Sequence, residues 1–136
     1  MVEHLIPTYI AHRLARGDRA ANLESAARWV AWLTERYLIE PVCPWIVLAS
    51  QWPESLRKLG LEVDLAAVRR CRAFVGVGPE WSTGMRAESD AFTGVGTRGW
   101  KRRAHRVASL VGHEIPMTRS GIVDGLLFVA GIRRRL

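Results

Sequence analysis

The sequence predicts a single α/β domain built on a doubly wound, mainly parallel sheet of about four to five strands flanked by helices. Its 136 residues are 49% apolar, which is enough material for one hydrophobic core. Short apolar runs alternate with longer segments in which apolar residues recur at helical spacing. No internal repeat is visible, so residues 1–136 are expected to form one domain of the flavodoxin-like or Rossmann-like kind.

The N-terminal part reads as a strand, a loop and a long helix. Leu5 to Ala11 is predicted as the first strand, and the polar segment from His12 to Arg19 as a loop. Apolar residues recur at helical spacing from Leu23 to Tyr37, which predicts an amphipathic helix that packs on the sheet. Either Asp18 or Asn22 is expected to cap that helix.

The middle of the chain contains the clearest strand, a short apolar run that ends at a glycine and a proline. The elements predicted there are, in order, a strand over Ile39 to Val42, a long irregular connection beginning at Cys43-Pro44-Trp45, a short helix over Glu54 to Leu59 ended by Gly60, a helix over Val63 to Cys71, a strand over Ala73 to Val77 and a helix over Gly84 to Phe92. Strands that alternate with helices in this way favour a parallel sheet.

The last third has a weaker pattern. Lys101 to Val111 is predicted as a helix, Glu114 to Met117 as a strand and Ile122 to Ile132 as a closing helix. The net charge of +7 arises entirely in this part, because residues 98–136 hold 9 basic and 2 acidic side chains. Such a basic end can attract nucleotides or nucleic acid, or form a solvated face or a contact with an acidic neighbouring subunit. No nucleic-acid-binding motif accompanies it.

Several functional classes are disfavoured by composition. The N-terminus lacks the pattern of a secretory signal, and the apolar run from Ile122 to Ile132 is too short to span a bilayer. Cys43 and Cys71 have no metal-type spacing and are expected to be reduced thiols, and His105 and His113 lack a ligand pattern. We therefore expect a cytoplasmic protein without a metal site.

Polar side chains are expected to gather where the parallel strands end. The carboxyl ends of the strands form the usual ligand crevice of a doubly wound sheet. The alternation of elements places these residues at or near that edge: Tyr9, His12, Asp64, Ser82, Gly84 and Glu88. Glu88 lies one turn into its predicted helix, and helical side chains lean toward the N-terminus, so Glu88 is expected to face Asp64 in the crevice.

The segment from Pro79 to Met85 has two interpretations. Ser82, Thr83 and Gly84 before a helix let backbone N–H groups and a hydroxyl approach an anion such as phosphate. The same residues are more often found as ordinary helix caps. In the same way, Glu88 and Asp64 have simpler roles as a solvated helix residue and as a helix N-terminal acid.

Three pieces of the chain together resemble the nucleoside 2-deoxyribosyltransferase-like superfamily. Tyr9-Ile10-Ala11 resembles its opening element, and the segment from Asp64 to Cys71 resembles its aspartate-bearing helix. Ser82-Thr83-Gly84-Met85-Arg86-Ala87-Glu88 resembles its Ser-x-Gly-x-x-x-Glu signature. The resemblance covers roughly Leu5 to Asp90. The superfamily includes nucleoside-monophosphate N-glycosidases and many uncharacterised phage and bacterial members.

The resemblance implies a reaction and assigns roles within it. The glutamate that matches Glu88 is the nucleophile, which attacks the anomeric carbon of a (deoxy)ribosyl group and displaces the base. The aspartate that matches Asp64 orients the nucleophile or helps to protonate the base, and Tyr9 contacts the site near the nucleophile. Ser82 is linked with the 5′-phosphate, which favours a nucleoside 5′-monophosphate over a free nucleoside. Relatives are homodimers or higher oligomers.

This sequence also departs from the family pattern. His12 and Arg13 stand where many relatives have Gly-Pro, and they are candidates for contact with phosphate or base. Trp45 is a candidate for stacking on the base, although packing in the core is its simpler role. Phe92 to Trp100 replaces the usual continuation and is an insertion or a lid. The alternatives to an enzyme are a catalytically silent nucleotide-binding or sensing module and a nucleic-acid accessory protein that uses the basic end.

Overall fold

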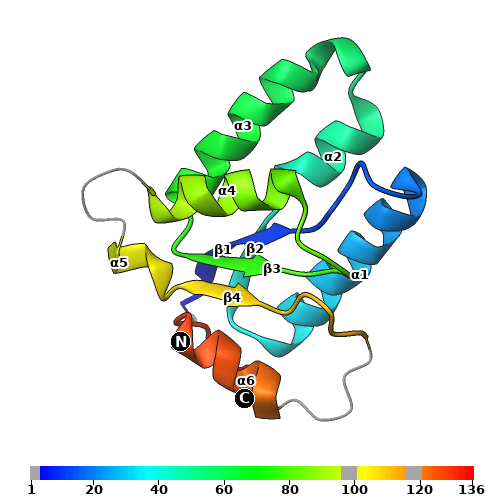
Figure 1. The fold of residues 1–136 in the computed structure, drawn as a ribbon. Coiled ribbons are helices and arrows are strands. Elements are labelled where there is room, and N and C mark those ends of the chain that lie inside the picture. Colours follow the sequence, from blue (N-terminus) through cyan, green and yellow to red (C-terminus); the bar gives the residue numbers. More distant parts are fainter. Residues whose placement is uncertain (1–3, 96–100, 116–120) are drawn as a thin grey trace.

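The computed structural model describes residues 4–95, 101–115 and 121–136. Four parallel strands form one sheet in the order β2-β1-β3-β4 (Figure 1). They are β1 (Ile6–Ala11), β2 (Ile39–Val42), β3 (Ala73–Gly76) and β4 (Val107–Ser109). The chain reverses its direction of travel across the sheet between β1 and β3, so the carboxyl ends of these two central strands flank the switch point where such sheets bind ligands.

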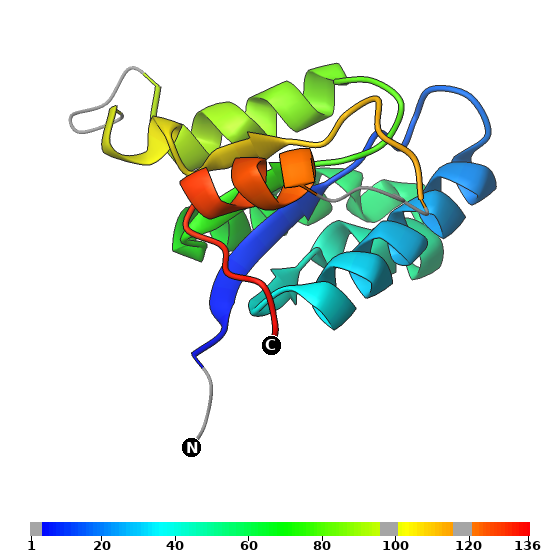
Figure 2. The ribbon, with the colours of Figure 1, turned by 90° about the horizontal axis from the view of Figure 1, so that it is seen from below.

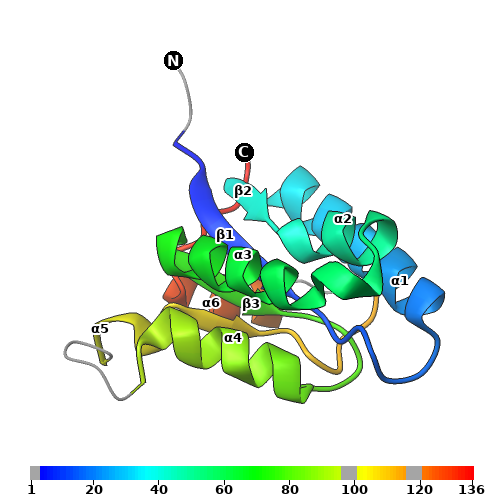
Figure 3. The ribbon, with the colours of Figure 1, turned by 90° about the horizontal axis from the view of Figure 1, so that it is seen from above.

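Helices cover both faces of this sheet. On one face lie α1 (Arg19–Arg36) and α6 (Gly121–Val129), which Figure 2 shows in front of the strands. On the other face lie α2 (Pro44–Gln51), α3 (Arg57–Arg70) and α4 (Thr83–Thr93), as seen in Figure 3. Two short pieces complete the described chain, the 3₁₀ turn η1 (Glu54–Leu56) and α5 (Lys101–Ala104). The predicted doubly wound α/β fold is therefore confirmed.

Each face of the sheet has its own apolar core, because alternate side chains of a strand point to opposite faces. In β3, Phe74 joins the cluster under α3 and α4, whereas Val75 joins the cluster under α1 and α6. Trp29 and Trp32 of α1 pack edge to face, with ring centroids 5.8 Å apart, and fill much of the second cluster. Burial on both faces explains why β3 reads as a continuous apolar run.

Most of the predicted elements are found with small shifts at their ends. This holds for β1, α1, β2, β3, α4 and α6. Of the two candidate caps, Asp18 is the N-cap of α1, where its carboxylate accepts the N–H of Ala21 at 3.2 Å. Asn22 is buried inside the first turns, and its side-chain amide donates to the carbonyls of Leu14 and Arg16. It thereby fixes the loop between β1 and α1.

Two predictions for the middle of the chain are wrong. The segment beginning at Cys43 is not an irregular connection, because Pro44 opens α2 as its first helical residue. Gly60 does not end a helix, since α3 runs through it to Arg70. Gly60 is buried, and a Cβ there would lie 3.7 Å from Leu48 of α2. This distance is an ordinary van der Waals contact, so Gly60 is an interior residue of α3 at its contact with α2.

The prediction of a helix over Lys101 to Val111 is also wrong. Only Lys101–Ala104 is helical, and Val107–Ser109 forms β4 by pairing with β3. A three-residue strand has too few positions for a period to be recognised, and its partner is remote in sequence. The predicted strand from Glu114 to Met117 fails at Glu114 and Ile115, which are not in a strand, and residues 116 and 117 lie outside the described part.

Candidate active site

Tyr9 lies at the centre of the sheet and points toward the face covered by α3 and α4. It pairs in register with Val42 of β2 and Phe74 of β3. Its ring is fully buried and stacks on Phe74, with centroids 5.5 Å apart and planes 16° apart. The Tyr9 hydroxyl donates a short hydrogen bond to Oε2 of Glu88. A strand residue and a helix residue far apart in sequence are thus in direct contact, as the sequence predicts.

Glu88 reaches this position because of how α4 is fixed on the sheet. Ser82 caps the helix, and the buried side chains of Met85 and Phe92 anchor its inner face. Glu88 lies one turn beyond Met85 on the same face, so its carboxylate is directed at β1. The residue is half-buried, which leaves it approachable from outside.

Asp64 completes the group from α3, which packs beside α4. It lies in the middle of α3 and not in the first turn, so the interpretation of Asp64 as a helix N-terminal acid is wrong. Asp64 is buried, with 9% of its surface exposed. Its Oδ1 has no hydrogen-bond partner among the residues that the structure describes. A buried carboxylate oxygen without a partner is costly and rare, and it is typical of a group that meets a ligand or performs chemistry.

The electrostatics of the three side chains are coupled. Burial, followed by the charge of Asp64, raises the pKa of Glu88 to about 7, although the hydrogen bond from Tyr9 opposes this rise. Burial alone raises the pKa of Asp64 to about 6. Burial and the two nearby carboxylates raise the pKa of Tyr9 well above its ordinary value, so Tyr9 stays a neutral donor. Carboxyl groups that titrate near neutrality in this way are typical of acid–base and nucleophilic sites.

Ser82 and Gly84 lie at the start of α4. Ser82 is the N-cap, since its Oγ accepts the N–H of Met85 at 3.1 Å. This capping leaves the Ser82 hydroxyl proton available for another acceptor. Gly84 is exposed in the first turn, and a Cβ there would come no closer than 3.9 Å to Ser82 Oγ. Capping is therefore observed, and phosphate binding at these residues stays a prediction.

His12 and Arg13 lie where β1 ends, at the switch point. Burial lowers the pKa of His12, so its ring is neutral, with Nδ1 2.6 Å from the Arg13 carbonyl and Nε2 3.0 Å from Ser25 Oγ. Arg13 forms an ion pair with Glu80 at 3.0 Å and donates from Nε to Asn22. These contacts join the loop after β1 to the loop after β3. Sequence reasoning missed the partnership with Glu80, which no local pattern signals.

Trp45 and Trp81 fix the walls of the site. Trp45 is buried, and its indole N–H donates to the Ile10 carbonyl at 2.9 Å, which ties α2 to the end of β1. Trp81 stacks on Phe74 at 6.3 Å and donates from Nε1 to Ser109 Oγ at 3.0 Å. A Cβ on Gly76 would lie 2.7 Å from the Trp81 ring, so this close stacking requires a glycine. The column of Tyr9, Phe74 and Trp81 was not predicted.

Arg133 and Arg134, at the basic C-terminal end, make contacts with residues of α6. Arg134 pairs with Asp124 at 3.3 Å, and the Arg133 guanidinium lies 4.3 Å from the centre of the Phe128 ring. Among the described residues, no three His, Cys, Asp or Glu side chains come together in a way that could hold a metal ion. The described helices include none with the length and apolar character needed to cross a membrane.

The fold and the site together define a doubly wound α/β protein with a buried carboxyl group, a half-buried carboxyl group and a buried tyrosine close to the carboxyl ends of its central strands. Residues 7–98 match the family model described as Domain of unknown function (DUF7768), and the chain belongs to that family. The matched region includes Tyr9, Asp64, Ser82 and Glu88. No curated protein and no solved structure matches the chain. Residues 96–100 of the proposed insertion or lid lie outside the described part.

Proposed function

We propose that this protein cleaves or transfers the N-glycosidic bond of a (deoxy)nucleoside or its 5′-monophosphate, through a covalent glycosyl–Glu88 intermediate. The observation that carries the proposal is the hydrogen bond from Tyr9 to Glu88 beside the buried, unpartnered oxygen of Asp64. A retaining displacement at an anomeric carbon requires an oriented nucleophile and an acid beside it. Here Glu88 is held by the neutral Tyr9 hydroxyl, and Asp64 is the acid.

The first step forms an ester between the sugar and Glu88. The ionised carboxylate of Glu88 attacks C1′ as the C1′–N bond breaks, and the bonding pair leaves with the base. In its protonated form, Asp64 donates its proton to the departing base, and in its ionised form it stabilises positive charge on the sugar. Tyr9 keeps the Glu88 carboxylate oriented toward the sugar.

The second step returns the free enzyme. Water or a second base attacks C1′ of the glycosyl ester, and the C1′–O bond breaks to restore the Glu88 carboxylate. Asp64, ionised after giving up its proton, accepts the proton released by the attacking water or base. Water as the acceptor gives hydrolysis and a second base gives transfer. Neither route needs a metal or an organic cofactor.

The binding residues complete the proposal. Ser82 and Gly84 are positioned at a helix N-terminus, where the hydroxyl proton and backbone N–H groups suit a 5′-phosphate. Arg13 offers a guanidinium at the same edge, although a phosphate must compete there with Glu80. His12 and Trp45, both buried at the end of β1, border the edge at which the base and sugar would lie.

The test is an assay of base release by chromatography, with a panel of nucleosides and their 5′-monophosphates. We expect wild type to release the base from at least one member. Glu88→Gln, which keeps the shape but not the nucleophile, is expected to lose activity by on the order of 10³-fold or more. Glu62→Gln, an exposed carboxylate of α3 outside the site, is the matched control and should keep the wild-type rate.

Intact-mass measurement during turnover adds a direct readout. A sugar adduct on wild type that is absent from Glu88→Gln supports the covalent intermediate. Full activity in Glu88→Gln would overturn the assignment of the nucleophile. Tight binding of a nucleotide with no release of base from any panel member would instead identify the protein as a binding or sensing module.

A further inference from the structure

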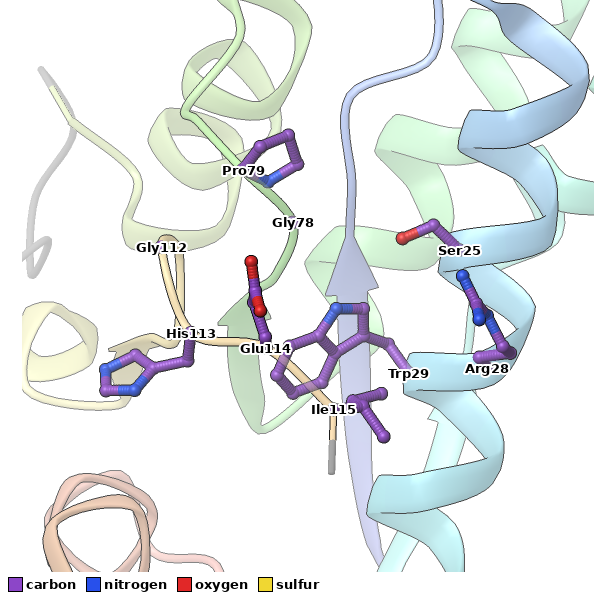
Figure 4. A pocket seen from close by; sticks show the side chains of 9 residues that line it. All are labelled: Ser25, Arg28, Trp29, Gly78, Pro79, Gly112, His113, Glu114 and Ile115. Atoms are coloured by element: carbon purple, nitrogen blue, oxygen red, sulfur yellow. The ribbon is translucent and has the colours of Figure 1, made fainter. Parts of the chain in front are cut away.

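A hollow opens at the carboxyl edge of the sheet, on the face opposite to Glu88. Its volume is about 490 Å³, which is within the usual range for small-molecule pockets. Three segments form its walls: the first half of α1, the loop after β3 and the loop after β4 (Figure 4). The lining residues are Ser25, Arg28, Trp29, Gly78, Pro79, Gly112, His113, Glu114 and Ile115.

Backbone hydrogen bonds hold the two loops in fixed positions. The N–H of Leu110 donates to the Gly76 carbonyl at 2.8 Å, and the N–H of Gly112 donates to the Gly78 carbonyl at 2.9 Å. Gly112 has a φ of +90°, a conformation that suits glycine, and it turns the chain so that Glu114 faces the hollow. The wall that carries Glu114 is therefore built into the backbone of the fold.

The opposite wall belongs to α1, which also supplies the floor. The indole of Trp29 forms part of this floor and is packed into the core, with 4% of the residue exposed. Ser25 borders the hollow, and its Oγ is held 3.0 Å from Nε2 of His12. Arg28 stands on α1 across from Glu114, and both side chains are exposed.

Arg28 and Glu114 are charged groups that the described fold does not use. Neither has a hydrogen bond or an ion pair with another residue in the described part of the chain. The hollow thus presents donors on one wall and an acceptor on the other, with an aromatic ring between them. A simple anion would fit this poorly, because Glu114 would repel it.

We propose that this hollow is a binding site for a guanine ring, separate from the site around Glu88. A guanidinium makes paired hydrogen bonds to the O6 and N7 acceptors of guanine. A carboxylate accepts from the donors on the other edge, the ring N–H and the 2-amino group. A flat ring beside Trp29 can face Arg28 and Glu114 at once, and adenine offers no comparable arrangement.

The site can receive guanine as a free base, a nucleoside or a nucleotide, since these share the ring. We would measure binding to the full chain by isothermal titration calorimetry, with 9-methylguanine, guanosine and guanosine 5′-monophosphate as separate arms. The first of these lacks a sugar and cannot undergo the reaction proposed for Glu88. 9-Methylhypoxanthine, without the 2-amino group, and 9-methyladenine are the specificity controls.

We expect 9-methylguanine to bind at least tenfold more tightly than 9-methylhypoxanthine, and 9-methyladenine to bind weakest. Arg28→Gln and Glu114→Gln should each weaken 9-methylguanine binding by tenfold or more. Arg86→Gln and Glu62→Gln, exposed residues of α4 and α3 on the other face, are the matched controls and should bind as wild type.

Two results would overturn the proposal. One is no binding of any guanine probe at its solubility limit. The other is binding that survives both Arg28→Gln and Glu114→Gln but is lost in Glu88→Gln, which would place the ring at the active site. Because 9-methylguanine has no glycosidic bond, failure of the proposed reaction leaves this measurement unaffected.

Discussion

Asp64 is a carboxyl group that folding buries while leaving Oδ1 without a hydrogen-bond partner among the described residues. Burial raises its pKa from 3.8 to about 6. Between these two values the folded state retains a proton that the unfolded state has released. The free energy of unfolding therefore falls as the pH rises through this window, and above pH 6 the ionised carboxylate continues to cost stability.

This sign gives a prediction for Asp64→Asn. The neutral amide removes the buried charge, so we expect the thermal midpoint to rise at pH 8 by roughly 3 °C, or about 1 kcal/mol. At pH 4, where the carboxyl group is largely protonated in the folded state, the variant should unfold close to wild type. Calorimetry at both pH values checks this, with Glu62→Gln as the exposed control. Equal destabilisation at the two pH values would contradict it.

Single residues differ in how far the sequence could predict their placement. Tyr9 and Glu88 were predictable, because each follows from a strand or helix assignment and from the rule that side chains lean along a helix. Asp64 was expected to open a helix at Val63, whereas it lies inside α3, which begins at Arg57. The Arg13–Glu80 pair and the Trp81 ring over Gly76 were not, because they depend on loops meeting across the sheet. The hollow beside Trp29 likewise combines three segments that share no local pattern.

Gly78 and Gly84 lie on either side of Ser82 and are expected to respond oppositely to substitution by alanine. Gly78 has a φ of +102°, and a Cβ there would lie 2.9 Å from the His12 ring. Gly84 is an exposed residue of α4 with open space around its Cα. We expect Gly78→Ala to lower the free energy of unfolding by about 1–3 kcal/mol, because strain and a clash act together. Gly84→Ala should raise it by up to about 0.5 kcal/mol through helix propensity.

Urea unfolding of the two alanine variants measures this contrast. A loss in Gly84→Ala as large as that in Gly78→Ala would contradict the assignment of backbone strain to Gly78 alone. If Gly84→Ala is stable but loses preference for 5′-monophosphates, the result also supports a close approach of phosphate to the start of α4.

At the scale of elements, length decided which predictions succeeded. The 18 residues of α1 and the buried run of β3 carry enough positions for a period or a continuous apolar pattern to be recognised. The three residues of β4 form a strand because they pair in parallel with β3, and this pairing is not visible in the local sequence. Gly60 misled because glycine usually marks a helix end, whereas here it is a buried residue inside α3 that faces Leu48 of α2.

The molecule has an exposed apolar surface on α6. This surface was not predicted from the sequence, because this part of the chain was described by its basic charge. Ile122, Leu126 and Val129 are 73%, 39% and 65% exposed, and their i, i+4, i+7 spacing puts them on one face of α6. Phe128 is 60% exposed on another side of the helix, where the Arg133 guanidinium lies over its ring. Contiguous apolar surface on a folded domain is typical of an interface. This surface supports the expectation of a homodimer or higher oligomer, with α6 as the contact.

We predict that the protein is at least dimeric by sedimentation velocity at micromolar concentration. The double variant Ile122→Lys, Val129→Lys should weaken association by at least about tenfold, because each lysine places a charge in an interface that excludes water. Its thermal midpoint should change little, since both side chains are exposed. Val47→Lys, at a 54% exposed position of α2 on the other face, is the matched control. A monomeric wild type, or equal dissociation by Val47→Lys, would mean that α6 is not the interface, and the apolar face of this helix would then need another partner.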